Sequence, residues 1–109
     1  MKAKSKYVRV SPFKLRPYAD VIRGATVERA FAWLKTWSLA RLKPLEKTLH
    51  SAYSNAKSQN QTLSQQKLVI SEIRIDGGPM FKYFTPAAQG RAVPQRKRLS
   101  HIEIKLEVR

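Results

Sequence analysis

The chain has 109 residues and a formal net charge of +15, from 22 Lys and Arg residues against 7 Asp and Glu residues. This length predicts one domain, and a hydrophobic content of 42% excludes a disordered basic tail. The absence of cysteine excludes disulfides and thiolate chemistry, while the large positive charge favours a polyanionic partner that would neutralise it.

One short strand and one helix are predicted to open the chain. Residues 6–10 alternate between apolar and polar side chains, as a short strand does. Ser11 and Pro12 suit the N-cap and the first position of a helix that is expected to stop at Gly24. Pro17 lies inside this helix, where it should remove one backbone hydrogen bond or bend the axis.

Two more helices follow in the sequence. Thr26 is expected to cap the second helix, which runs to about residue 36, and Ser38 is expected to cap the third, which runs to about residue 58. Pro44 lies near the start of the third helix, so the regular part is expected to begin there. The polar residues 59–66 then predict a solvent-exposed loop.

Two strands separated by a long connection complete the chain. Residues 67–76 are rich in β-formers, and residues 101–109 alternate, with Ile102, Ile104, Leu106 and Val108 facing one way. Such alternation is typical of a half-buried antiparallel strand. The connection between them, residues 77–100, is too long for a tight turn. It is either disordered or formed by the two strands continuing as an arm, and the arm explains the strand character at its base.

These elements predict an α+β fold. Three helices are expected to pack on a small antiparallel three-stranded sheet that carries a long extended β-hairpin arm. The globular part of this single domain is expected to comprise about residues 1–76 and 99–109, and the arm about residues 77–98.

Positive charge gathers in two blocks that are almost free of acids. Residues 1–24 hold seven Lys and Arg residues against one acid, and residues 77–100 hold five against none. Ordinary protein surfaces intersperse both signs, so we interpret the blocks as RNA-binding surfaces. The candidate residues are Lys2, Lys4, Lys6, Arg9, Lys14, Arg16, Arg23, Lys82, Arg91, Arg96, Lys97, Arg98 and His101.

Aromatic residues interleave with the cations of the arm. Phe81, Tyr83 and Phe84 surround Lys82. Aromatic rings among cations can stack on unpaired bases, or they can pack on one another along a hairpin. The sequence leaves both alternatives open.

Catalytic and metal chemistry are not expected. The chain has only two histidines, His50 and His101, and its acids are dispersed without the spacing of a metal site. Gly77 and Gly78 precede a proline and lack the Lys-Ser/Thr of a phosphate loop. We therefore expect no enzyme activity, cofactor or small-molecule substrate. No apolar run is long enough to span a membrane, and no secretory signal is expected.

Several strings resemble the bacterial-type large-subunit ribosomal protein 22 family. The first is Tyr7–Pro12, continued by Lys14, Arg16, Ala19-Asp20 and Ile22-Arg23-Gly24. The second is the segment from Leu49 to Ala56, LHSAYSNA. The third and most specific comprises Gly78-Pro79, Lys82, Phe84, Pro86, Ala88, Gly90-Arg91-Ala92, Lys97-Arg98 and Ser100-His101-Ile102.

The resemblance implies a structural role in the large ribosomal subunit. The globular part would lie near the exit of the nascent-peptide tunnel, and the hairpin would line the tunnel wall and reach the constriction where macrolides act. The implied partners are 23S-type rRNA, neighbouring ribosomal proteins and the nascent polypeptide, with a role in early subunit assembly. The implied location is the cytoplasm, in the ribosome, with an organellar ribosome left open.

The resemblance also implies which arm residues line the tunnel. They are Met80, Phe81, Tyr83, Phe84, Ala87, Ala88, Gln89 and Gly90. This chain departs from the common pattern where Phe13, Tyr83, Thr85, Ala87 and Gln89 stand at positions that are usually arginine, so its arm tip is less cationic than is usual in the family.

Three other classes remain as alternatives. The first is a helix-turn-helix DNA-binding protein, since the turn at Gly24 joins two helices, although the second helix offers only Arg29 and Lys35 as cations. The other two are a basic membrane-surface protein, for which no long Lys-rich amphipathic helix is predicted, and an RNA-processing enzyme.

Overall fold

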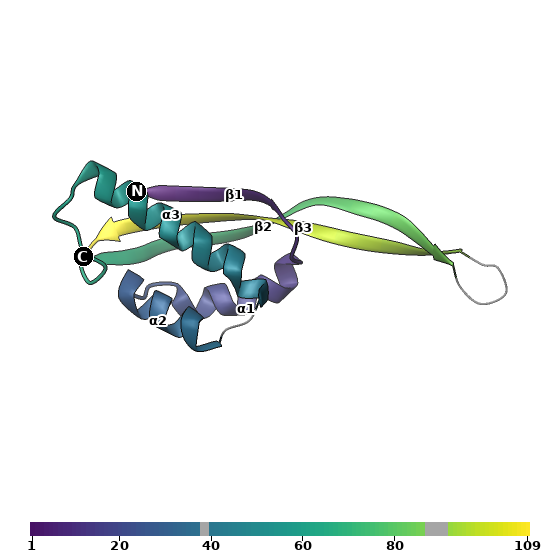
Figure 1. Ribbon diagram of the computed structural model, residues 1–109, viewed down its shortest axis with the longest axis horizontal. Helices are drawn as coiled ribbons and strands as arrows, with labels where there is room; N and C mark the ends of the chain where they lie inside the picture. The colour runs from purple at the N-terminus through teal and green to yellow at the C-terminus, as the bar shows by residue number, and fades with distance from the viewer. Residues whose placement is uncertain (38–39, 87–91) are drawn as a thin grey trace.

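The computed structural model describes residues 1–37, 40–86 and 92–109, with backbone alone for 80–86 and 92–97. The predicted α+β fold is confirmed: three helices lie on one face of an antiparallel sheet with strand order β1-β3-β2 (Figure 1). The elements in chain order are β1 (Lys2–Val8), α1 (Pro12–Ile22), α2 (Val27–Trp37), the short 3-10 helix η1 (Ala40–Leu42), α3 (Lys43–Gln59), β2 (Leu68–Pro86) and β3 (Ala92–Val108).

β1 begins four residues before the predicted strand, and it contains a bulge. Tyr7 has a φ of 58°, and the pairing with β3 shifts between Ser5 and Val8. A bulge adds one residue to a strand and changes which residues face inward. Ala3 and Ser5 therefore face the core before the bulge, and Val8 faces it after the bulge. Because the alternation changes at the bulge, the pattern over residues 6–10 does not predict that the strand begins at Lys2.

Several helix signals in the sequence are confirmed, although Ser11, at the N-cap position of α1, makes no side-chain cap hydrogen bond. α1 begins at Pro12, continues through Pro17 and ends before Gly24, which has a φ of +80°. Thr26 caps α2, because its Oγ1 accepts a hydrogen bond from the Arg29 backbone N–H at 3.3 Å. α3 begins with Pro44 in its first turn. The backbone N–H groups of the first turn have no partner within a helix, so the missing N–H of proline costs no hydrogen bond there. Ser38 lies outside the described residues, and the N-cap of α3 is Leu42, so the prediction that Ser38 caps this helix is wrong.

The core lies between the helices and the sheet. Its buried side chains include Leu15 and Ile22 of α1, Val27 and Leu34 of α2, Leu45 and Leu49 of α3, Ile70 and Ile73 of β2, and Ile102 and Ile104 of β3. Leu63 is only 7% exposed, so the prediction of an entirely solvent-exposed loop over residues 59–66 is wrong. Val108, predicted to share the inward face of its strand, is 56% exposed at the end of the sheet.

The strands β2 and β3 form one long antiparallel hairpin. Their pairing runs from Leu68 opposite Val108 to Pro86 opposite Ala92, with a register shift between Gly77 and Met80. The hairpin extends well beyond β1 and the helices (Figure 1), and the molecule measures 64 × 25 × 16 Å. Over residues 80–86 and 92–97, the structure therefore has the two paired strands of an arm and not a disordered connection. Residues 87–91 lie outside the described residues.

Candidate nucleic-acid interface

The lysines of β1 lie on the face of the sheet that the helices leave open. On the helix side, the Ser5 Oγ lies 2.7 Å from the Thr48 Oγ1 of α3. Because successive side chains of a strand point to opposite faces, Lys2 and Lys4 project from the open face, and both are exposed. Lys6, beside the bulge, is exposed as well.

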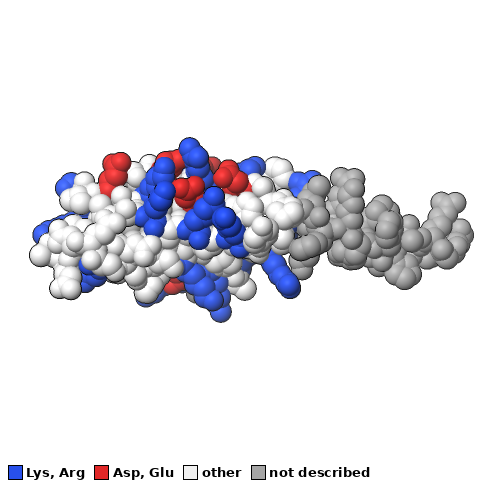
Figure 2. Space-filling model, turned by 90° about the horizontal axis from the view of Figure 1, so that it is seen from above, with Lys and Arg blue, Asp and Glu red and all other residues white. Residues whose placement is uncertain are grey.

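The open face also carries acids, and cations of the sheet offset them. Lys4 lies opposite Glu103 in the strand register, and Glu103 lies opposite Arg74. Glu72 forms ion pairs with Arg74 and, at 3.3 Å, with Lys105. A hydrogen bond from Lys105 and the nearby charge of Arg74 hold the pKa of Glu72 below its usual value of 4.5. Figure 2 shows these two signs of charge interspersed, with blue side chains in the majority and continuing to the base of the arm.

Two predicted RNA-binding arginines, Arg16 of α1 and Arg23 at its C-cap, contact the edge strand β2. The Arg16 Nε and Nη2 both donate to the Ile75 carbonyl at 3.2 Å. The Arg23 Nη2 donates to the Ile73 carbonyl at 3.0 Å, and its Nη1 pairs with Asp20 at 2.6 Å. An edge strand leaves carbonyl groups unpaired, so these arginines satisfy the edge of the sheet while adding positive charge to it.

Phe13 connects two predicted RNA-binding arginines at the base of the arm. Its ring is 61% exposed, and the guanidinium carbons of Arg16 and Arg98 lie 5.3 and 5.2 Å from its centroid. These are cation–π distances. Phe13 is absent from the predicted RNA-binding set, although the structure places it between two members of that set. Its spacing of three from Arg16 is visible in the sequence, but its contact with Arg98 on β3 is not.

His101 is held by the bulge of β1. Its Nδ1 accepts a hydrogen bond from the Tyr7 backbone N–H at 3.2 Å, and the two rings meet edge to face at 5.2 Å. A Cβ built on Gly78 would lie 3.3 Å from the His101 ring. The Ser100 hydroxyl beside it also donates to the Val10 carbonyl. This histidine therefore fastens the start of the chain to the base of the arm, and its contact with RNA stays a prediction.

The fold brings part of the predicted set together. Arg16 and Arg98 share the Phe13 ring at the base of the arm, and His101 contacts Tyr7 there. Lys2, Lys4 and Lys6 lie along the open face of the sheet. Arg9, Lys14 and Arg23 are exposed on the adjoining turn and helix.

The remaining predicted residues belong to the arm. Lys82 pairs with Arg96, and Phe81 with Lys97, in the backbone register, and Met80, Tyr83 and Phe84 lie on β2. Arg91, Ala87, Ala88, Gln89 and Gly90 lie outside the described residues.

Among the described residues, no group of three His, Asp or Glu side chains is placed to hold a metal ion. No helix in the described ranges is long and apolar enough to cross a membrane.

Comparison with known proteins identifies the family. The model of the family "Ribosomal protein L22p/L17e" matches residues 3–107. The large ribosomal subunit protein uL22 of a Synechococcus species is 46% identical over 95% of this chain and 83% of its own length. Similar relatives are uL22c of Chlorokybus atmophyticus, 42% identical over 94% of this chain and 86% of its own, and uL22 of Roseiflexus castenholzii, 42% identical over 94% and 90%. The chain therefore belongs to the ribosomal protein L22p/L17e family, a structural and non-enzymatic family.

Proposed function

We propose that this protein is a structural constituent of the large ribosomal subunit that binds 23S-type rRNA through its basic surfaces. It supports early subunit assembly, and its β2–β3 hairpin lines the nascent-peptide exit tunnel. Its partners are the rRNA, neighbouring ribosomal proteins and the nascent polypeptide, and it works in the cytoplasm, in the ribosome. The observation that carries this proposal is a chain with a net charge of +15 whose folded core continues into a long two-stranded arm.

The binding set comprises the cations of β1, α1 and the arm. Contacts to phosphate and to helix shape carry most of such binding, because the deep, narrow major groove of double-stranded RNA hides its bases from side chains. The acids of the sheet lie among cations of the sheet, as Glu72 does between Arg74 and Lys105. Most of the net charge of +15 therefore lies in residues 1–24, with seven cations against one acid, and in residues 77–100, with five against none, where RNA would neutralise it.

The arm suits a narrow passage through RNA. Antiparallel pairing of β2 and β3 satisfies the backbone groups between the two strands, so the arm can leave the core without a helix to cover it. An isolated two-stranded hairpin is only marginally stable in water, and packing against rRNA would supply the missing support. The cation–π contact of Arg98 with Phe13 links the base of the arm to α1.

Co-sedimentation tests this function. A tagged copy of the protein is expected to travel with large subunits through a high-salt wash, and recovery in the ribosome-free fraction would overturn the proposal. Binding of the purified protein to large-subunit rRNA should weaken steeply with salt. If eight cations contact phosphates, the slope of log K against log salt is expected to be about −6.

A further inference from the structure

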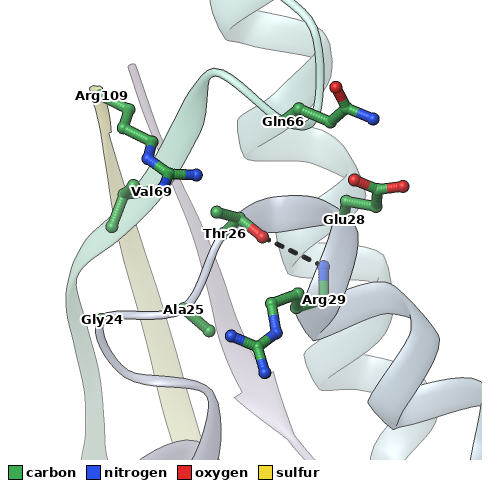
Figure 3. Close-up of a pocket in the computed structure, with 8 residues that line it drawn as sticks. All are labelled: Gly24, Ala25, Thr26, Glu28, Arg29, Gln66, Val69 and Arg109. Atoms are coloured by element: carbon green, nitrogen blue, oxygen red, sulfur yellow. Dashed lines mark hydrogen bonds between the residues drawn. The ribbon is translucent and has the colours of Figure 1, made fainter.

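A pocket of about 460 Å³ lies at the end of the sheet opposite to the arm. Its floor is the turn between α1 and α2, which two hydrogen bonds fasten to β2. The Gly24 N–H donates to the Ile70 carbonyl, and the Ile70 N–H donates to the Ala25 carbonyl, both at 3.0 Å. The position of this floor is therefore fixed by the sheet. The pocket is lined by Gly24, Ala25, Thr26, Glu28, Arg29, Gln66, Val69 and Arg109 (Figure 3).

Two arginines from different elements line this pocket. Thr26 fixes the backbone of Arg29 through the helix cap, and the Arg109 N–H donates to the Lys67 carbonyl at 2.7 Å. Their side chains lie on either side of the Thr26 turn, and the carboxylate of Glu28 points away from both (Figure 3). Among the described residues, neither guanidinium has a hydrogen-bond or ion-pair partner, in contrast to Arg16, Arg23 and Arg74.

The pocket continues into two further hollows that lead towards the arm. The first shares Gly24, Ala25 and Arg29 with the pocket and extends to Arg23 and Trp33. The second shares Arg23 with the first and extends along β2 to Arg16. Arginines thus line a path from the Phe13 contact at the base of the arm to the opposite end of the sheet.

We propose that the pocket is a second attachment point for RNA, in which Arg29 and Arg109 each bind a phosphate of one sugar-phosphate backbone. A guanidinium offers paired N–H donors that match phosphate oxygens, and the adjoining hollows would let the same strand continue towards the arm. This proposal rests on the proposed rRNA binding and adds to it a site outside the two basic blocks of the sequence.

A charge-matched comparison tests the pocket. The double variant Arg29→Gln/Arg109→Gln and the control Lys47→Gln/Lys57→Gln each remove two positive charges, and the control lysines are exposed on α3. Binding of the full chain to large-subunit rRNA is measured over a range of salt. We expect the pocket variant to bind about tenfold more weakly and to have a slope shallower by about 1.5 to 2. The control should change both quantities less.

Glu28→Gln provides the opposite test at the same place. Glu28 lines the pocket although its carboxylate points away from the two arginines, so removing its negative charge should strengthen RNA binding if a phosphate sits there, by less than the loss in the arginine variant. Circular dichroism is expected to show the same unfolding midpoint for all four proteins. If the wild-type chain binds rRNA and the pocket variant matches the α3 control, the pocket proposal is wrong. If the wild-type chain does not bind rRNA, the proposed function itself fails.

Discussion

At the scale of single residues, the base of the arm is held by contacts that are distant in the sequence. Tyr7 and His101 are 94 residues apart and share a hydrogen bond, and Phe13 contacts Arg98. The sequence alone shows which cations lie in this region, because the blocks of charge are visible without a structure. It did not predict their partners, because nothing local to Phe13 or Tyr7 specifies which residue of β3 will face it.

Gly78 gives this contact region its sharpest test. A Cβ at position 78 would come 3.2 Å from the Leu99 carbonyl oxygen and 3.3 Å from the His101 ring, whereas a Cβ at Gly77 would meet nothing within 4 Å. We expect Gly78→Ala to lower the free energy of unfolding by about 1 kcal/mol or more, because a backbone atom must shift. Gly77→Ala is the matched control and should be neutral within about 0.5 kcal/mol.

Urea denaturation measures the free energy of unfolding of the two variants. The NMR resonances of the His101 imidazole report on its contact with position 78 directly. They should move in Gly78→Ala and stay in place in Gly77→Ala. Equal stability of the two variants would show that the strands separate freely at this point, and the interpretation of His101 as a fastening residue would be wrong.

At the scale of elements, the end of α1 and the start of α2 could be predicted from the sequence, whereas the cap of α3 and the inward faces of the strands could not. A helix cap or stop depends only on the adjacent turn of backbone, so the residue type was enough to predict it at Thr26, Pro44 and Gly24. A bulge depends on two strands together. The register shifts near Tyr7 and Ser71 change which face of the strand points inward, and no local signal in the sequence marks them.

The same argument applies to the loop between α3 and β2. Its polar composition predicted exposure, yet Leu63 is buried in the core. A single apolar residue in a polar stretch carries no periodicity, so only the packing of neighbouring elements decides its burial. The pocket residues Arg29 and Arg109 were missed for a related reason, because their proximity depends on the antiparallel bridge between Thr26 and Val69.

The ion pairs across β2 and β3 predict a pH dependence. The pKa of Glu72 is lowered in the folded protein, mainly by the hydrogen bond from Lys105. A lowered pKa contributes stability above the ordinary pKa of the carboxyl group, and this contribution is lost as the pH falls through the lowered value. Glu72→Gln should therefore be less stable than the wild type at neutral pH, and the difference should vanish on acidification.

Urea denaturation between about pH 7 and about pH 3 measures this difference. Glu107→Gln is the matched control, since Glu107 lies opposite Val69 and has no ion pair among the described residues. The control should show no such convergence with the wild type. A stability difference for Glu72→Gln that persists to the lowest pH would mean that its packing, and not its charge, is responsible.

At the scale of the whole molecule, the folded core and the arm have different physical requirements. The core is closed by apolar side chains from the three helices and from the parts of β2 and β3 that lie beside β1 or the helices. The arm consists of two paired strands with a surplus of cations and no acid. The sequence places the arm at about residues 77–98, because the apolar alternation stops where the acid-free block begins, and these bounds stay a prediction.

Replacing the arm by a short turn tests the division and the proposed interface together. Met80 and Arg98 pair in the backbone register, so an Asn-Gly turn in place of residues 81–97 can close the hairpin there. We expect this variant to unfold cooperatively at nearly the wild-type midpoint, because the core residues are retained. Its rRNA binding should weaken, with a salt slope shallower by about 3, since Lys82, Arg91, Arg96 and Lys97 are lost.

A second variant separates the charge of the arm from its length. It keeps all residues of the arm except these four cations, which become glutamine. If charge alone carries the arm's contribution, both variants should show the same salt slope. If the arm also packs against RNA by shape, the full-length variant should bind more tightly than the shortened one at every salt concentration. A shortened chain that fails to fold would show that the core depends on the arm, and one that binds rRNA like the wild type would remove the arm from the interface.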